Sequence, residues 1–249
     1  MLARIHYLLP DSVAAIRIIE FSGQRRIWRN ALILLSLFPF LLLVTGTLSQ
    51  IATQKALAAV DSGNNKVAFH YLAQAKKMWP TNDFNWYMEG EIVRANLAQT
   101  DHLADHEYLQ LLEYAEESFQ RTMELNPLRA SAPHHYGNLL EAVPASLMRT
   151  SVDKIIALYR RALIIDPGYY PARIDLARLY VQQEDITSAH EILELGYHHF
   201  FYRTPDVIPY LEITQQFRLM AGNQEGADQL KEEIEQIKNS WQSPMDSKY

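Results

Sequence analysis

The chain has 249 residues, a net charge of −6 and no cysteine, so disulfides and cysteine-ligated zinc sites are excluded for this sequence. The length allows one elongated domain or two compact ones. Charge is unevenly spread along the chain. Residues 1–30 carry five arginines and two acidic residues, and no residue from Ala31 to Ile51 is charged. The remainder of the chain carries 18 basic and 27 acidic residues. Because no basic stripe follows the uncharged stretch, we do not expect nucleic-acid binding.

Residues 1–30 are predicted to form a cytoplasmic, basic, amphipathic segment. Apolar residues recur from Ile5 to Phe21, and Pro10-Asp11 has the character of a helix start with Asp11 as the N-cap. Such a helix can lie on the cytoplasmic face of a membrane. The alternative is a disordered or partner-bound segment.

Residues 31–51 are predicted to form a transmembrane helix. The uncharged stretch is about as long as the roughly 18–20 residues that a bilayer span requires. Lipid-embedded helices tolerate a proline such as Pro39, and Trp28 is expected at the interface. One alternative is a buried core helix, although core helices are rarely apolar all round for this length. The other is a cleaved signal peptide, which the long basic region and the lack of a convincing cleavage site disfavour.

The arginines before this stretch and the acidity after it predict an orientation. The positive-inside rule places residues 1–30 in the cytoplasm and residues 51–249 across the membrane. In a bacterial cell this is an inner (cytoplasmic) membrane protein with a single pass and a periplasmic C-terminal part. No linker follows the stretch, so we expect the first helix after it to continue the transmembrane helix.

A spacing then recurs three times: a small residue, a proline twelve positions on, and a small residue ten further on. The sets are Ala68, Pro80 and Gly90; Ala115, Pro127 and Gly137; and, with a looser first member, Ile155, Pro167 and Ala177. Ala189 follows Ala177 by twelve residues and closes a fourth unit. A fixed period of this kind indicates stacked helical hairpins, which usually bind partners.

These residues resemble the tetratricopeptide repeat (TPR), whose period is about 34 residues. Trp86, Phe119 and Tyr159 stand where the pattern has aromatic residues. The resemblance covers residues 49–203 in four units, 49–82, 83–129, 130–169 and 170–203, followed by a degenerate or capping hairpin at 204–241 and a flexible tail at 242–249. It implies an all-α fold, with the N-terminal transmembrane helix followed by a TPR-like α-solenoid of four to five hairpins.

The register predicts specific packing. Gly90, Gly137 and Ala177 should let the first helix of a hairpin (helix A) approach the second (helix B), with Phe119 and Tyr159 filling space between hairpins. Two insertions interrupt the spacing: Gly90 to Ala115 is 25 residues and Gly137 to Ile155 is 18, where 12 are expected. They predict longer loops or extended helices, and an exposed backbone from Thr100 to Glu107.

We find no catalytic motif, so neither an enzyme nor a cofactor is expected. His102 and His106 would share a helix face, but two ligands fall short of the four that a structural metal site needs, and a solvated polar loop is the alternative. No metal site is predicted. In each pair, His134-His135 and His198-His199, we expect one packed and one exposed imidazole.

In the TPR family the concave face is lined mainly by helix A. The resemblance therefore implies a partner-binding set that could hold an extended peptide, or a groove that is merely solvated. The set is Phe84, Tyr87, Glu91, Arg94, His134, Asn138, Glu141 and Arg178, with Ile174 and Val181 on the same face. His134 stands where a lysine is needed to clamp a carboxylate terminus, so that ligand is not predicted.

The sequence thus predicts a membrane-anchored TPR scaffold or adaptor that binds protein partners in the periplasm, in envelope assembly or secretion. Its layout resembles membrane-anchored periplasmic repeat proteins that associate with secretion machinery. The alternative is an accessory subunit, or a detached C-terminal part, of an O-antigen or other polysaccharide ligase or polymerase system.

Overall fold

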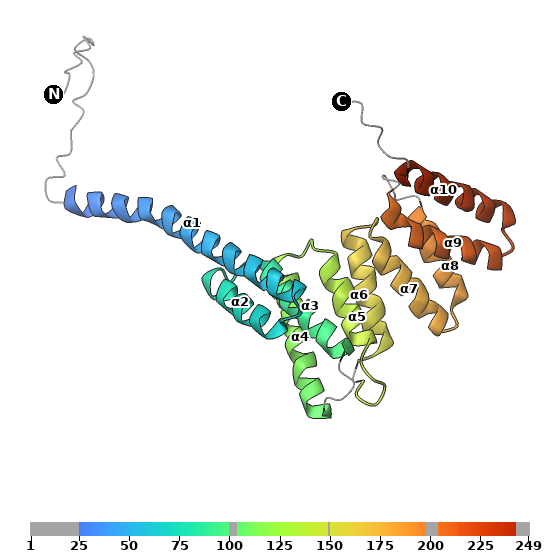
Figure 1. Cartoon of the computed structure of the whole chain (residues 1–249), viewed down its shortest axis with the longest axis horizontal. Helices are drawn as coiled ribbons and strands as arrows, with labels where there is room; N and C mark the ends of the chain where they lie inside the picture. Colours follow the sequence, from blue (N-terminus) through green and yellow to red (C-terminus); the bar gives the residue numbers. More distant parts are fainter. Residues whose placement is uncertain (1–24, 100–103, 149, 198–203, 243–249) are drawn as a thin grey trace, which may run out of the picture. The chain divides into compact units, whose positions relative to one another are not determined.

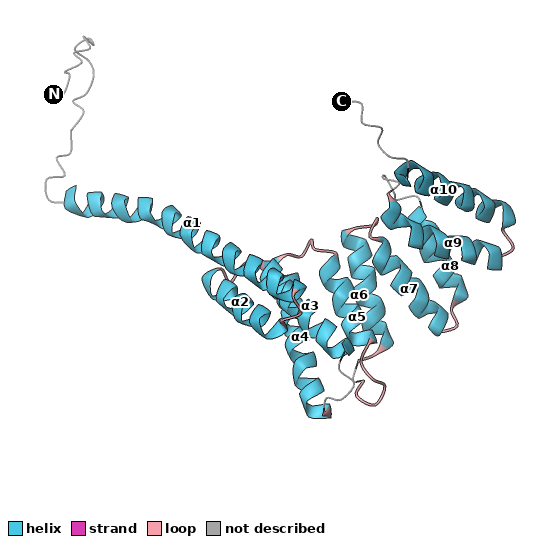
Figure 2. Ribbon diagram, in the orientation of Figure 1, coloured by secondary structure: helices cyan, strands magenta, loops and turns pink. Residues whose placement is uncertain are grey.

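The structure, a computed structural model, describes residues 25–99, 104–148, 150–197 and 204–242 (Figure 1). Every regular element in these ranges is a helix (Figure 2). The chain divides into two units, Met1–Thr47 and Leu48–Tyr249. The predicted segment 5–22, the side chain of Trp28, His102, His198, His199 and the tail after Gln242 lie outside what the structure describes.

The elements follow the predicted alternation of helices. They are α1 (Arg25–Asp61), α2 (Asn65–Met78), α3 (Asp83–Gln99), α4 (Asp105–Leu125), α5 (Ser131–Glu141), α6 (Val152–Ile165), α7 (Tyr170–Gln182), α8 (Ile186–Tyr197), the short 3₁₀ helix η1 (Pro205–Val207), α9 (Ile208–Met220) and α10 (Gln224–Gln242).

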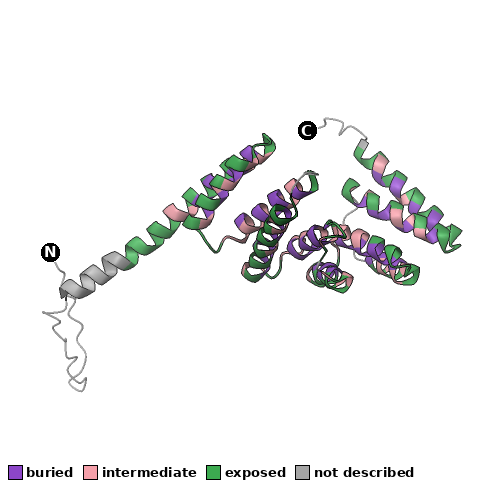
Figure 3. Ribbon diagram, turned by 90° about the horizontal axis from the view of Figure 1, so that it is seen from below, coloured by how far each residue is buried: buried purple, intermediate pink, exposed green. Residues whose placement is uncertain are grey.

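Helix α1 is continuous for 37 residues, with Pro39 inside it. Its apolar part exposes large side chains, which Figure 3 shows as an exposed stretch. By length and composition, Leu35–Asp61 is the one helix in the described residues that could cross a membrane, and only 11% of its apolar window is buried. That low burial disfavours the interpretation as a core helix.

The C-terminal part of α1 has a different environment. Ser49, Ala52, Ala56 and Ala59 are buried, and Ala56 and Ala59 belong to one apolar cluster with Ala68 and Leu72 of α2. The last turns of α1 are therefore helix A of the first hairpin, and helix A continues the apolar helix without a linker.

Four more helix pairs follow: α3 with α4, α5 with α6, α7 with α8, and α9 with α10. One apolar cluster extends through them from Val93 to Ile237. In two of the five hairpins, helix A ends for a recognisable reason. Gly63 and Gly222 take the left-handed backbone, with φ of 73° and 77°, directly after a helix. The last pair is a well-packed hairpin, since Tyr210 and Leu230 are fully buried.

The two insertions are accommodated differently. The first lengthens both helices of its pair, because α3 has 17 residues and α4 has 21, against 11 in α5 and 14 in α6. In the segment Thr100 to Glu107, predicted to be exposed, the described residues 104–107 are exposed, and Asp105–Glu107 form the first turn of α4; there the Glu107 carboxylate accepts from the backbone N–H of Ala104. The second insertion forms the loop 142–151.

Candidate functional site

The predicted partner-binding residues lie on α3, α5 and α7, which are helix A of three successive pairs. Side chains on these helices form a chain of hydrogen bonds, ion pairs and one ring contact that crosses from α3 to α5 and from α5 to α7. We call it the polar ladder. Its members are Arg94, Glu91, His135, His134, Asp175 and Arg178.

Glu91 is the centre of the first half of the polar ladder. Its carboxylate accepts two hydrogen bonds of 3.0 Å from Arg94 and one of 2.6 Å from Nδ1 of His135. The Tyr87 hydroxyl lies 3.2 Å from the same nitrogen. Burial would raise the pKa of Glu91, but the hydrogen bonds from His135 and Arg94 outweigh it and lower that pKa. The result is a charged contact between α3 and α5.

His134 and Asp175 form the second half. Nε2 of His134 lies 2.7 Å from Oδ2 of Asp175, and its Nδ1 lies 3.2 Å from the Tyr169 hydroxyl. Arg178 pairs with the other oxygen of Asp175 at 2.9 Å. Burial opposes ionisation of Asp175, yet the hydrogen bond and charge of His134, together with Arg178, lower its pKa. The two neighbouring imidazoles meet edge to face at 5.1 Å, which joins the two halves.

Asn138 and Glu141 are connected to the polar ladder through Tyr159 and Asp175. The fully buried Tyr159 places its hydroxyl 2.6 Å from Oε2 of Glu141, to which it donates. With the Asn138 amide nitrogen turned toward α6, that nitrogen donates to the Tyr159 hydroxyl at 2.7 Å and to Asp175 at 3.3 Å. Burial first, and then Glu141, raise the pKa of Tyr159.

Phe84 lies at the start of α3 and is joined to Tyr87 through Arg129. The guanidinium of Arg129 lies 5.9 Å from the ring of Phe84 and 5.2 Å from that of Tyr87, and it pairs with Asp83 at 2.6 Å. All eight predicted residues are therefore half-buried or buried in one connected face, except Arg178, whose side chain is 58% exposed. The Arg94 side chain is 31% exposed.

Two predictions about this face need correction. His134 is 4% exposed, so it contacts neighbouring repeats and offers little surface to a partner. The expected division into one packed and one exposed imidazole is also wrong here, because the His135 side chain is only 21% exposed and bonds to Glu91. The side chains of adjacent helical residues point in different directions, but α5 has α3 on one side and α7 on the other. Each of the two imidazoles therefore contacts a neighbouring helix.

His135, Asp175, Tyr169 and Arg129 also belong to this face, although they were not among the predicted partner-binding residues. Asp175 stands three residues before Arg178, a spacing at which helical side chains of opposite charge meet, so that pair could have been found. The contacts of Arg129 and Tyr169 depend on how one pair stacks on the next, which no local pattern specifies.

A second polar cluster lies between α2, α3 and α4. The carboxylate of Glu89, at 1% exposure, accepts from Lys76 at 2.5 Å, from Ser118 at 3.0 Å and from the hydroxyl of Tyr114. A buried charge is tolerated when it is fully partnered, as here. These bonds connect three helices, and both oxygens of Glu89 are used in them.

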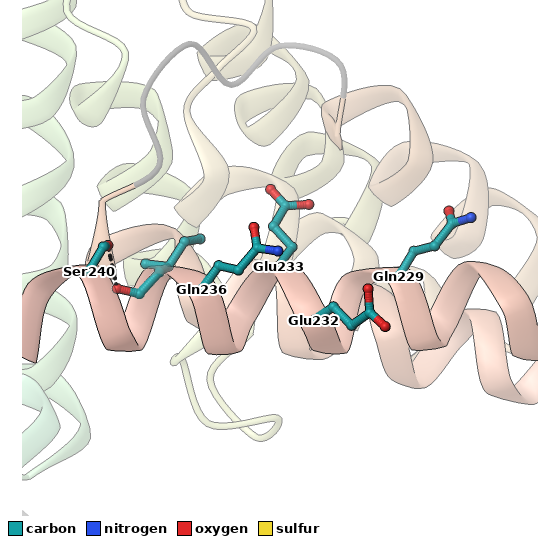
Figure 4. A pocket seen from close by; sticks show the side chains of 6 residues that line it. Gln229, Glu232, Glu233, Gln236 and Ser240 are labelled. Carbon is teal, nitrogen blue, oxygen red and sulfur yellow. Dashed lines mark hydrogen bonds between the residues drawn. The ribbon is translucent and has the colours of Figure 1, made fainter.

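The hollows in the described residues include the following two. One, of about 260 Å³, lies between α4, α5 and the loop 142–151, with Leu112, Leu140 and Met148 in its lining. The other, of about 460 Å³, is lined from α10 alone; its side chains are polar, apart from Ile237 (Figure 4). Within the described ranges no group of three or more metal-ligating side chains occurs. His106 lies in the first turn of α4, and His102 is outside those ranges.

Comparison with known proteins agrees with this fold. Residues 150–196, which hold α6, α7 and nearly all of α8, match the family model of the tetratricopeptide repeat. No protein of curated function matches the chain.

Solved structures are similar at low identity. A structure of PilF from Pseudomonas aeruginosa has a TM-score of 0.55 and 14% identity, over 78% of each chain. MamA from Desulfovibrio magneticus RS-1, from residue 41 to its end, has a TM-score of 0.52 and 14% identity, over 80% of this chain and 99% of that one. The repeat stack is therefore an all-α assembly that resembles TPR solenoids, a class whose members generally bind other proteins.

Proposed function

We propose that this chain is a membrane-anchored TPR scaffold that binds a protein partner on the extracytoplasmic side of a bacterial inner membrane, in envelope assembly or secretion. The observation that supports this proposal is a change of environment along α1. This single helix passes from large exposed apolar side chains to small ones buried in the first hairpin. A helix with that change of environment joins the repeat stack directly to an apolar phase.

The exposed part of α1 is unfavourable in water and favourable in lipid. Seven large side chains are 44–69% exposed: Leu35, Leu37, Phe38, Phe40, Leu41, Leu42 and Leu43. At about −0.3 to −0.6 kcal/mol each on an insertion scale, they favour lipid by roughly 2–4 kcal/mol. Thr45 and Thr47 donate their hydroxyls to the carbonyls of Leu41 and Leu43, so these polar groups are satisfied without water.

The orientation rests on charge. The five arginines of residues 1–30 precede the apolar stretch, and the remainder of the chain is net acidic. Arginine-rich segments stay on the cytoplasmic side, so the repeats lie on the other side. A reporter that is active only outside the cytoplasm, fused after Tyr249, should be active. Activity from a cytoplasmic reporter alone at that position would reverse the orientation.

The binding face we propose is the polar ladder together with Tyr87. Each end of the ladder carries an arginine that remains partly exposed, at 31% for Arg94 and 58% for Arg178. An extended segment of a partner crossing α3, α5 and α7 would meet both guanidiniums, which donate to carboxylates and backbone carbonyls. Aromatic and arginine side chains are also the types that most often dominate binding energy.

The test compares two arginine variants. Arg94→Ala with Arg178→Ala should retain helical circular dichroism and membrane location, and lose the protein that the native chain cross-links to in intact membranes. Arg121→Ala is the matched control, because Arg121 forms an i,i+3 pair with Glu124 on α4 and is 43% exposed. Equal recovery of the partner with the double variant and with the control would refute this binding face.

A further inference from the structure

The turn between α2 and α3 lies beside the point where the chain leaves its apolar stretch. The carbonyl of Ala75 accepts two hydrogen bonds, one of 3.0 Å from the Ser49 hydroxyl and one of 2.9 Å from the backbone N–H of Trp79. Ser49 directly follows Leu48, the last leucine of that stretch. Trp79 is thus placed next to the end of the apolar helix by a shared hydrogen-bond acceptor.

The residues of this turn have the composition of a membrane interface. We call residues 77–81 the interfacial turn. Met78 and Trp79 are 37% and 36% exposed although both are large and apolar, and Lys77 beside them is exposed. Tryptophan is enriched at the headgroup level of membranes, and lysine keeps its ammonium in water or among phosphates while its methylene chain lies against apolar groups.

Contacts with side chains of α3 hold the interfacial turn in place. The Trp86 indole donates to the carbonyl of Pro80 at 3.0 Å. The Lys76 ammonium lies 4.1 Å from the centre of the Trp86 ring and pairs with the buried Glu89. A turn fixed in this way presents Met78 and Trp79 outward without first having to be ordered, which removes an entropic cost of binding.

The corresponding turn of the next pair does not share these features. It exposes Leu128 at 79%, but its basic residue, Arg129, is engaged by Asp83 at 2.6 Å. It contains no tryptophan. The combination of tryptophan, methionine and an exposed lysine therefore occurs at the turn that adjoins the apolar helix.

We propose that the interfacial turn is seated in the headgroup region of the bilayer that α1 enters, with Trp79 and Met78 among the upper acyl chains and Lys77 at anionic phosphates. This inference rests on the proposed membrane anchoring. It adds a second contact, which holds the first hairpin against the lipid surface and keeps the binding face of α3 close to the membrane.

The experiment uses the absence of cysteine from the chain to place single labels. The full chain carries an environment-sensitive fluorophore at Thr81→Cys, in the turn, or at Ser62→Cys, at the far end of the same hairpin. The 14 residues of α2 separate these ends by about 21 Å. A third label at Phe40→Cys reports on the anchor itself. Vesicles contain phosphatidylcholine and phosphatidylglycerol, with a nitroxide on either the headgroup or the acyl chain.

We expect acyl-chain nitroxides to quench the label at position 40, and headgroup nitroxides to quench position 81 several-fold more than position 62. Adding Trp79→Ala and Lys77→Ala should remove most of the quenching at position 81. Trp241→Ala, which removes an exposed tryptophan from α10, should leave it unchanged.

The outcomes separate the two proposals. Quenching at position 40 with none at position 81, or with equal quenching at 81 and 62, overturns the interfacial turn and leaves the anchor intact. No quenching at position 40 overturns both. Protection of position 81 from water without lipid quenching would indicate a protein neighbour and would also overturn the lipid contact.

Discussion

The α3/α4 and α5/α6 pairs follow one register but differ in how they accommodate an insertion. In both, a helix-A glycine faces a helix-B aromatic ring, Gly90 against Phe119 and Gly137 against Tyr159. The first pair turns its extra residues into helix, whereas the second turns them into the loop 142–151.

The difference follows from which residues were inserted. Within the extra turns of the first pair, Val93, Leu97, Tyr108 and Leu112 recur at helical spacing, and all are buried in the core. In the second pair, Pro144 interrupts the helix and the residues from Pro144 to Ser146 are exposed. An insertion in a repeat stack thus becomes helix when it carries an apolar stripe, and becomes loop when it does not.

The largest expected effect is on proteolysis. Limited chymotrypsin digestion should cleave at Leu147 or Met148 at least roughly tenfold faster than at any site inside α4, because cleavage within a packed helix requires local unfolding, and each 1.4 kcal/mol of opening slows it tenfold. Mass spectrometry of early fragments measures this. Early cuts between Asp105 and Leu125 would show that the first insertion is not stable helix.

Leucine at either glycine is expected to have the next largest effect. A Cβ at Gly137 would lie 2.5 Å from the Tyr159 ring, and one at Gly90 would lie 3.0 Å from the Phe119 ring. Leucine extends further into these contacts, so each variant should lower the free energy of unfolding of residues 48–249 by about 1–3 kcal/mol or more. Urea unfolding measures it, with Gly137→Leu as the more severe change. An unaltered midpoint for both would contradict the packing.

The close approach of helix A to helix B at Gly90 and Gly137 could be predicted from the sequence, because it depends on the repeat register; the rings of Phe119 and Tyr159, expected between neighbouring hairpins, are what the two glycines meet. Gly90 with Phe119 and Gly137 with Tyr159 occupy fixed positions in the repeat, and the structure brings them together. The lack of a linker after the apolar stretch likewise predicted that the first helix of the repeats continues the apolar helix, as α1 does.

The polar ladder could not be predicted in the same way. His134 bonds to Asp175, 41 residues away, and His135 to Glu91, 44 residues earlier. Both contacts depend on the rotation of one pair against the next, which is set by packing throughout the stack. Family position indicated which helices carry the face, but it could not show that most of its side chains are used to connect repeats.

The polar ladder predicts a smaller effect, at acid pH. Because Glu91 and Asp175 have lowered pKa values in the folded chain, each stabilises the stack above its unfolded pKa of about 4, and this stabilisation is lost as the pH falls through the folded value. Glu91→Gln, at the α3–α5 contact, should cost about 1 kcal/mol at pH 7 and less below pH 4. Urea unfolding of residues 48–249 at both pH values measures it.

The matched control for this prediction is Glu117→Gln, since Glu117 is an exposed carboxylate on α4. It should leave both the stability at pH 7 and its decrease in acid unchanged. A Glu91→Gln variant that loses stability in acid as steeply as the native chain would show that Glu91 does not contribute to the acid sensitivity.

Alanine at the two glycines is expected to have the smallest effects, and they should differ in kind between the pairs. In a helix, alanine is favoured over glycine by about 0.5–1 kcal/mol. At Gly90 the new Cβ would be 3.0–3.1 Å from three atoms of the Phe119 ring, so a displacement of a few tenths of an ångström relieves the contact. The gain in helix propensity then nearly offsets the strain, and stability should change by less than about 0.5 kcal/mol.

At Gly137 the same atom would lie 2.5 Å from Cε1 of Tyr159, and this ring is held by the hydrogen bonds that its hydroxyl donates to Glu141 and accepts from Asn138. The ring cannot move away without lengthening them, so we expect a net loss of somewhat less than about 1 kcal/mol. Adding Tyr159→Phe, which frees the ring, should reduce the cost of Gly137→Ala; a double-mutant cycle by urea unfolding measures this coupling. If the two costs add independently, the hydrogen bonds of Tyr159 do not restrain its ring, and the second pair differs from the first only in its loop.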